Sequence, residues 1–143
     1  MYKRQGEYRL FADNWGVESD TFRLDYIHPF EDWTMHLNLR YYDQTAADFY
    51  SDLFPFSEAT TFRARDKELS TYTTLAYGIG GSYEFPESWV PFFDKSSVNL
   101  FVDQVNYDYS DFRNVTVEGF NAGEEPFYSF DALVFRLFLS FWY

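Results

Sequence analysis

The segment Trp33–Gln44, with the sequence WTMHLNLRYYDQ, decides the fold class of this chain. Its odd positions carry large apolar or aromatic side chains, namely Trp33, Met35, Leu37, Leu39 and Tyr41. Most of its even positions carry polar ones, namely Thr34, His36, Asn38, Arg40, Tyr42 and Gln44. Successive side chains of a β-strand point to opposite faces, so this alternation predicts a strand with one apolar and one wet face.

The same period of two recurs along the chain, with turn residues between the runs. The other predicted strands are Glu7–Asp13, Thr21–His28, Thr71–Phe85, Val98–Tyr109 and Phe127–Tyr143. Pro29 through Asp32 are expected to end the second strand. In the fifth, the apolar residues change parity, and a β-bulge near Asp103 would explain the change. The sequence thus predicts an all-β, antiparallel up-and-down meander of about six strands.

The composition suggests where such a sheet would lie. Aromatic residues make up 24% of the 143 residues and charged residues also 24%. This combination suits a sheet with one apolar face and one water-exposed face. No apolar run reaches the roughly 18–20 residues of a membrane helix, whereas a membrane-spanning strand needs only about 9–11. We therefore expect a transmembrane β-barrel.

Charge and cysteine content exclude several other functions. The formal net charge is −12, which argues against binding to nucleic acid, because phosphate neutralisation needs clusters of Lys and Arg. The chain has no cysteine, and hence no disulfide, cysteine-based zinc site or thiol chemistry.

The connections are expected to alternate in length, as they do in outer-membrane barrels. Asp43–Ser70 and Ser110–Pro126 would be extracellular loops, and residues 28–32 and 86–97 would be periplasmic connections. Aromatic residues should form a girdle at each rim. One girdle would hold Tyr26, Trp33, Tyr83, Phe85 and Trp89, and the other Tyr41, Tyr72, Tyr107 and Tyr109.

The two ends of the chain suggest a piece of a longer protein. Met1-Tyr2-Lys3-Arg4-Gln5 matches the translation of a transposon sequencing adapter, so residues 1–5 are expected to be an artefact and residues 6–143 a single partial barrel domain. Six strands are fewer than the eight or so of the smallest membrane barrel, so the barrel would be open or incomplete as given. The apolar final strand, which ends on Tyr143, resembles the signal that barrel assembly machinery recognises.

A more specific resemblance rests on Arg40-Tyr41-Tyr42-Asp43-Gln44-Thr45-Ala46-Ala47-Asp48-Phe49-Tyr50, on Tyr8–Phe11 and Asp13–Gly16, and on residues 125–132 with the final strand. These segments resemble the bacterial family catalogued as domain of unknown function 3570. The resemblance covers essentially Gly6–Tyr143. It implies the C-terminal part of an outer-membrane barrel of a Gram-negative bacterium, and it brings no activity, ligand or catalytic residue with it.

The spacing of the reactive side chains indicates no catalytic or metal-binding site. His28 and His36 are too far apart to suggest a metal site, and no serine is spaced with His36 and a carboxylate as a triad requires. Acidic residues of the later connections also lack the spacing of a calcium loop, and a solvated acidic surface is expected there; they are Asp103, Asp108, Asp111, Glu124 and Glu125. We therefore predict no catalytic, cofactor-binding or metal-binding residue, no cofactor, and a protein that is not an enzyme.

Charged residues on the expected inner face allow two interpretations. Arg9, Arg23, Asp25, Arg40 and Glu84 could line a selective pore, but a network of mutually satisfied charges is the favoured interpretation. Gly78 and Gly80, also inward, could leave room for a plug or relieve strand curvature.

The functional expectation is an outer-membrane β-barrel with a pore, transport or structural role. Its partners would be outer-membrane lipid and, through the C-terminal strand, the barrel assembly machinery. The alternative is a soluble secreted β-protein that binds a hydrophobic or glycan ligand, and an outer-membrane enzyme ranks below it.

Overall fold

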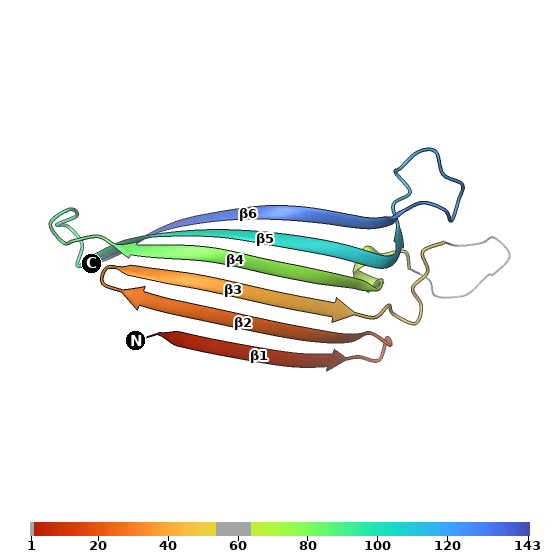
Figure 1. Cartoon of the computed structure of the whole chain (residues 1–143), viewed down its shortest axis with the longest axis horizontal. Helices are drawn as coiled ribbons and strands as arrows, with labels where there is room; N and C mark the ends of the chain where they lie inside the picture. Colours follow the sequence, from red (N-terminus) through yellow and green to blue (C-terminus); the bar gives the residue numbers. More distant parts are fainter. Residues whose placement is uncertain (1, 54–63) are drawn as a thin grey trace.

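Six antiparallel strands form one sheet in chain order, as a computed structural model covering residues 2–53 and 64–143 shows (Figure 1). The strands are β1 (Lys3–Ala12), β2 (Glu18–Phe30), β3 (Trp33–Gln44), β4 (Tyr72–Glu84), β5 (Lys95–Arg113) and β6 (Phe127–Trp142). The only helical turn of the described residues is the 3-10 turn η1 (Lys67–Leu69). The predicted all-β meander is confirmed, and the bounds of β3 match the predicted ones.

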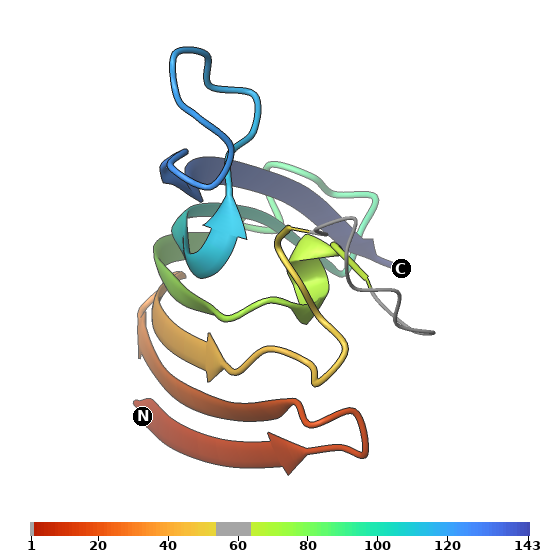
Figure 2. The ribbon, with the colours of Figure 1, turned by 90° about the vertical axis from the view of Figure 1, so that its right-hand side faces the viewer.

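The sheet is open, because β1 and β6 lie at its two edges. It curves strongly, so that it has a concave inner face and a convex outer face (Figure 2). The connections β1–β2, β3–β4 and β5–β6 gather at one end, called here the loop end. The connections β2–β3 and β4–β5 lie with both termini at the other, the turn end (Figure 1). The predicted grouping of the connections is confirmed.

Cross-strand register confirms the predicted division into two faces. Directly opposed residues of an antiparallel pair share a face. One row of opposed residues is apolar, and consists of Tyr26, Leu37, Ile79, Val102 and Phe135. The neighbouring row, on the other face, is mainly polar or small, and consists of Asp25, Asn38, Gly78, Asp103 and Val134.

One local prediction was wrong, and one strand ends slightly later than expected. The β4–β5 register runs without a shift from Tyr72↔Tyr109 to Glu84↔Ser97, so there is no bulge near Asp103. The irregularity of β5 lies instead between Asp108 and Arg113, in its pairing with β6. Pro29 does not end β2, which continues to Phe30. A proline is tolerated there because it stands at the end of the strand, next to a tight turn in which Glu31 has a φ of 53°.

The origin of the first five residues stays a prediction. Lys3, Arg4 and Gln5 belong to β1, where they pair with Ile27, Tyr26 and Asp25. This pairing does not test whether residues 1–5 originate from a sequencing adapter.

Candidate functional site

The β3–β4 connection, whose described residues are 45–53 and 64–71, folds over the inner face at the loop end (Figure 2). Gln44, the last residue of β3, donates from Nε2 to the carbonyl oxygens of Glu68 and Ser70, at 2.8 and 2.9 Å. The amide of Ala47 donates to the carbonyl of Leu69 at 2.9 Å. These bonds hold the two limbs of the connection together where they cover the sheet.

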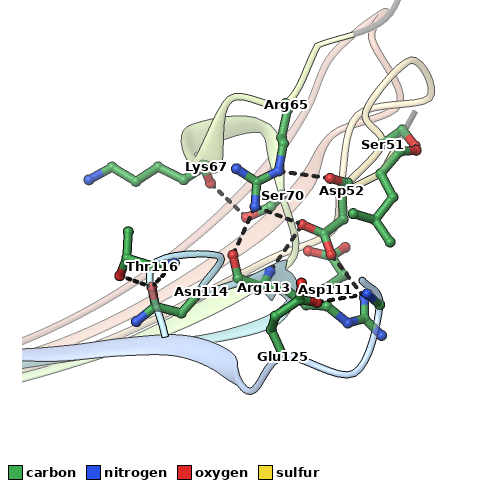
Figure 3. A network of polar contacts seen from close by, with 12 residues as sticks. Ser51, Asp52, Arg65, Lys67, Ser70, Asp111, Arg113, Asn114, Thr116 and Glu125 are labelled. Carbon is green, nitrogen blue, oxygen red and sulfur yellow. Dashed lines mark hydrogen bonds and ion pairs between the residues drawn. The ribbon is translucent and has the colours of Figure 1, made fainter. Parts of the chain in front are cut away.

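Asp52 lies at the centre of an ion-pair cluster that joins the connection to β5 (Figure 3). Its side chain is only 9% exposed and contacts Arg113 Nη1 at 2.8 Å and Arg65 Nη2 at 3.3 Å. It also accepts the backbone amide of Arg113 at 3.0 Å. A buried carboxylate is tolerated only with such partners, because the desolvation of the charge must be offset by ion pairs and hydrogen bonds.

Further contacts join the same connection to β5. Arg65 donates to the carbonyl oxygens of Asp52 and Arg113, at 2.7 and 2.8 Å. The Tyr50 hydroxyl donates to the carbonyl of Asp111 at 3.1 Å. Burial raises the pKa of the Tyr50 phenol, and the carboxylates of Asp111 and Asp52 raise it further. Tyr50 therefore stays protonated, and able to donate this bond, above the pH at which a free phenol ionises.

Aromatic side chains of β3, β4 and β5 lie beneath the connection. Tyr72 lies between Tyr42 and Tyr109, with ring centroids 5.6 and 5.2 Å away. The guanidinium of Arg65 lies over the ring of Phe112, 4.5 Å from its centroid. Tyr72 and Tyr109 were expected in an aromatic girdle at the rim. That expectation was wrong for both and for Tyr107. Tyr72 is opposite Gln44 and Tyr109, and Tyr107 is opposite the buried Thr74, all on the covered inner face.

A second polar cluster lies midway along the inner face. Asp103 accepts from Asn38 Nδ2 at 3.1 Å and pairs with Arg136 Nη2 at 2.6 Å. A Cβ added to Gly78 would lie 2.1 Å from the Asp103 carboxylate, and one added to Gly80 would lie 2.1 Å from the Phe101 ring. The glycines therefore make room for two β5 side chains, which neither interpretation of the sequence foresaw.

The other predicted inward charges are mostly engaged locally. Arg23 Nε pairs with Asp25 at 2.7 Å, and Glu84 pairs with Lys95 at 2.8 Å. Arg40 lies over the ring of Tyr42, 5.3 Å from its centroid. These contacts favour the interpretation of a satisfied charge network. Arg9 lies in β1 opposite Thr21.

The two histidines lie on opposite faces. His28 is opposite Met35 on the outer face and hydrogen-bonds through Nδ1 to the Tyr26 hydroxyl at 2.8 Å. His36 is on the inner face, with its ring centroid 5.4 Å from that of Phe101. Within residues 2–53 and 64–143, no three His, Asp or Glu side chains are placed to hold a metal ion together.

The acidic residues considered for calcium are spread over different contacts. Asp103 belongs to the Asn38–Arg136 cluster, and Asp111 accepts the amide of Thr71 at 2.8 Å. Glu124 accepts from the Asn121 side chain at 2.8 Å, and Glu125 from the Gly123 amide at 2.7 Å.

The outer face has the opposite character. Its β6 side chains are largely exposed, with Phe135 at 66%, Leu137 at 65% and Leu139 at 60%. At the turn end, Trp33, Tyr83, Phe85 and Trp89 form a chain of rings with centroids 4.7 to 6.0 Å apart. These four were predicted at this rim, and their clustering is confirmed. Tyr26 lies farther along β2, next to His28.

An open antiparallel meander with an apolar outer face and a polar, partly covered inner face defines a single-sheet, all-β class of protein. Residues 4–93 match the family described as "Protein of unknown function (DUF3570)". The match covers more than half of the chain, so the chain belongs to this family, as the residues around Arg40–Tyr50 predicted. The resemblance carried by residues 125–143 lies outside the match and stays a prediction.

Searches of curated proteins and of solved structures found no match. Among the described residues, no helix is both long and apolar enough to cross a membrane.

Proposed function

We propose that this chain forms part of the wall of an outer-membrane β-barrel in a Gram-negative bacterium, with a pore, transport or structural role and no catalytic one. The observation that carries the proposal is the contrast between the faces of one sheet. The outer rows of β3–β6 are mainly apolar and exposed, with Gln104, Asn106 and Asp131 as polar members nearer the loop end, whereas the inner rows contain the paired charges. Alternation of this kind is what a strand needs between lipid and a wet interior.

The size of the exposed apolar surface supports lipid as the partner. Soluble monomers rarely expose continuous apolar patches larger than a few hundred Å². Here apolar side chains follow one another across the outer face of four strands, from Leu37 and Leu39 to Ile79, Leu100 and Leu137. Each fully buried Leu or Ile side chain contributes about 1.5–3 kcal/mol relative to water, so a lipid surface would stabilise this face strongly.

The edges of the sheet support a closed assembly. β1 and β6 each leave one row of backbone groups without a strand partner in the sheet. In a bilayer, unpaired backbone groups are too unfavourable to persist, and a barrel removes them by pairing its first and last strands. We propose that further strands complete the wall, and that β6 is the strand presented to the barrel assembly machinery.

A nitroxide scan tests the proposal, and the absence of cysteine makes single labels straightforward. A protein in which further strands close this wall, labelled singly at Leu39, Asn38, Leu137 or Arg136, would be reconstituted into phosphatidylcholine vesicles. Labels at Leu39 and Leu137 should be relaxed mainly by oxygen, which concentrates in lipid. Labels at their neighbours Asn38 and Arg136 should be relaxed mainly by a water-soluble nickel chelate.

Two outcomes would contradict the proposal. One is the reverse pattern, with Asn38 in lipid and Leu39 in water. The other is a folded protein, with its wall completed by further strands, that fails to float with vesicles in a density gradient. That second result would favour the alternative of a soluble protein that binds a hydrophobic or glycan ligand with its exposed rings.

A further inference from the structure

The β3–β4 connection crosses the width of the sheet on its inner side (Figure 2). At one side it contacts the β1–β2 connection, where the Asp48 amide donates to the carbonyl of Trp15 at 2.8 Å. At the other side Lys67 Nζ lies over the Phe130 ring of β6, 5.9 Å from its centroid. The described residues of this one connection therefore reach from the first hairpin to the last strand.

The strand ends beneath the connection are buried, although their side chains are polar. Thr21, Gln44 and Thr74 are between 3 and 5% exposed, and Ser70 of the connection itself is fully buried. Among the described residues, no buried side-chain nitrogen or oxygen lacks a hydrogen-bond partner. A polar contact surface with every buried group satisfied holds its parts in one arrangement, since any displacement would leave groups unpaired.

The Asp52 cluster fixes this arrangement most strongly. It joins Asp52, on the first limb of the connection, to Arg65 on the second limb and to Arg113 on β5 (Figure 3). Moving the connection off the inner face would separate this desolvated carboxylate from the guanidinium and the backbone amide of Arg113. Breaking a buried pair in this way is strongly unfavourable.

Outside the loop end the inner face is only partly covered. Arg136 of the midway cluster has a side chain that is 48% exposed, and the nearby Phe138 is 51% exposed. The contacts of the β3–β4 connection are therefore confined to the loop end, and the burial of Ser97 near the turn end does not depend on them.

We propose that the two described limbs of the β3–β4 connection, residues 45–53 and 64–71, form a fixed partition over the inner face at the loop end, with Asp52 as the positioning residue. Arg136 of the midway cluster lies outside this partition and stays accessible to small solutes and ions. The inference goes beyond the proposed membrane role and does not depend on it, because it concerns only how one part of the chain covers another.

Thiol labelling of the full chain in detergent micelles tests this partition. One reporter is Thr74→Cys, which lies beneath the connection, and the other is Ser97→Cys, a buried inner-face position near the turn end. Each would be combined with Asp52→Asn and allowed to react with a charged maleimide. We expect Asp52→Asn to raise the labelling rate of Thr74→Cys by about tenfold or more, because a lost buried ion pair weakens the cover. The rate at Ser97→Cys should change less than twofold.

Asp66→Asn is the matched control. Asp66 belongs to the same connection, is exposed, and caps η1 by accepting the Glu68 amide, a bond that asparagine also makes. It should leave both labelling rates unchanged. If Asp52→Asn does not fold, Arg65→Gln removes one of the two guanidinium partners of Asp52. This variant should raise the labelling rate of Thr74→Cys less than Asp52→Asn is expected to.

Two results would overturn the inference. The Thr74→Cys rate could stay unchanged in both cluster variants, or it could rise together with the Ser97→Cys rate. The second result would mean that the cluster supports the whole fold and does not position a cover. Failure of the membrane proposal would leave both rates as expected, so the two proposals are tested separately.

Discussion

The outer face of β6 and the loop end of the inner face belong to the same sheet but invert the usual rule of burial. On the first, Leu137 and Phe135 are largely exposed, while on the second, Thr74 and Gln44 are buried. Among the described residues, only Val17, Ala47 and Tyr109 are buried hydrophobic ones. The polar side of this sheet is therefore covered at the loop end by the chain itself, whereas its apolar side is left exposed.

The contrast also separates two sources of stability. The loop end is held by specific contacts between charged and hydrogen-bonding groups, which depend on geometry. The outer face can be stabilised only by the removal of apolar area from water, which is non-directional. Substitutions on the two sides should accordingly respond to different conditions, and the following experiments compare matched positions.

The largest effect is expected for the buried ion pair compared with an exposed one. Asp52→Asn should lower the free energy of unfolding by about 3–5 kcal/mol, because two guanidinium groups lose their buried counterion. Glu84→Gln removes an exposed pair with Lys95 and should change it by less than about 1 kcal/mol. Denaturant unfolding in detergent, followed by tryptophan fluorescence, measures both. Equal effects would show that the Asp52 cluster is not effectively buried.

Next comes the comparison of the two faces at the middle of β3. Leu39→Lys should destabilise the vesicle-inserted chain by about 2–4 kcal/mol, the range for a basic residue facing the centre of the bilayer. The adjacent Asn38→Lys places the same charge on the inner face, next to Asp103, and should have much less effect. Unfolding from vesicles and from detergent distinguishes them, and similar losses at both positions would contradict the division into a lipid face and a wet face.

Adjacent glycines of β4 provide a smaller, purely steric comparison. Gly80→Ala would place a methyl group 2.1 Å from the Phe101 ring, so that ring must move, at a loss of about 1–3 kcal/mol. Gly81→Ala faces the other side, where nothing lies within 4 Å, and should be neutral or stabilising by up to about 1 kcal/mol. Unfolding midpoints of the two variants check this order, and a larger loss at Gly81 would place the Phe101 ring elsewhere.

The smallest effect concerns alkaline pH at the loop end. The folded state raises the pKa of Tyr50, so the unfolded chain releases this proton first, near pH 10. The stabilisation by the neutral phenol is therefore complete below about pH 10 and declines as the pH rises toward the folded pKa. Tyr50→Phe should be less stable than the parent at pH 8, with a smaller difference at pH 11. A difference that stayed constant would argue that Tyr50 is not desolvated.

The regular alternation of the sequence determined most of the sheet. Trp33–Gln44 could be predicted to the residue, because strong period-two patterning leaves one register in which the apolar side chains share a face. β5 could not. Val105 and Tyr107 are apolar but face inward with Asp103, and their parity alone indicated a bulge. Register there is decided by the ladders with β4 and β6, where Ala76 and Ala132 stand opposite Val105 and the inner face tolerates it.

Only the tertiary structure decided what covers the inner face. Asp52 and Arg113 are 61 residues apart, and nothing in their neighbourhoods in the sequence indicates that they form an ion pair. The aromatic residues near Tyr72 carry no sign that they lie beneath a connection and not at a rim. Local patterning determines which way a side chain points from a strand, because that depends on neighbouring residues. The position of a long connection depends on contacts between distant residues, which arise only when the curvature of the sheet brings them together.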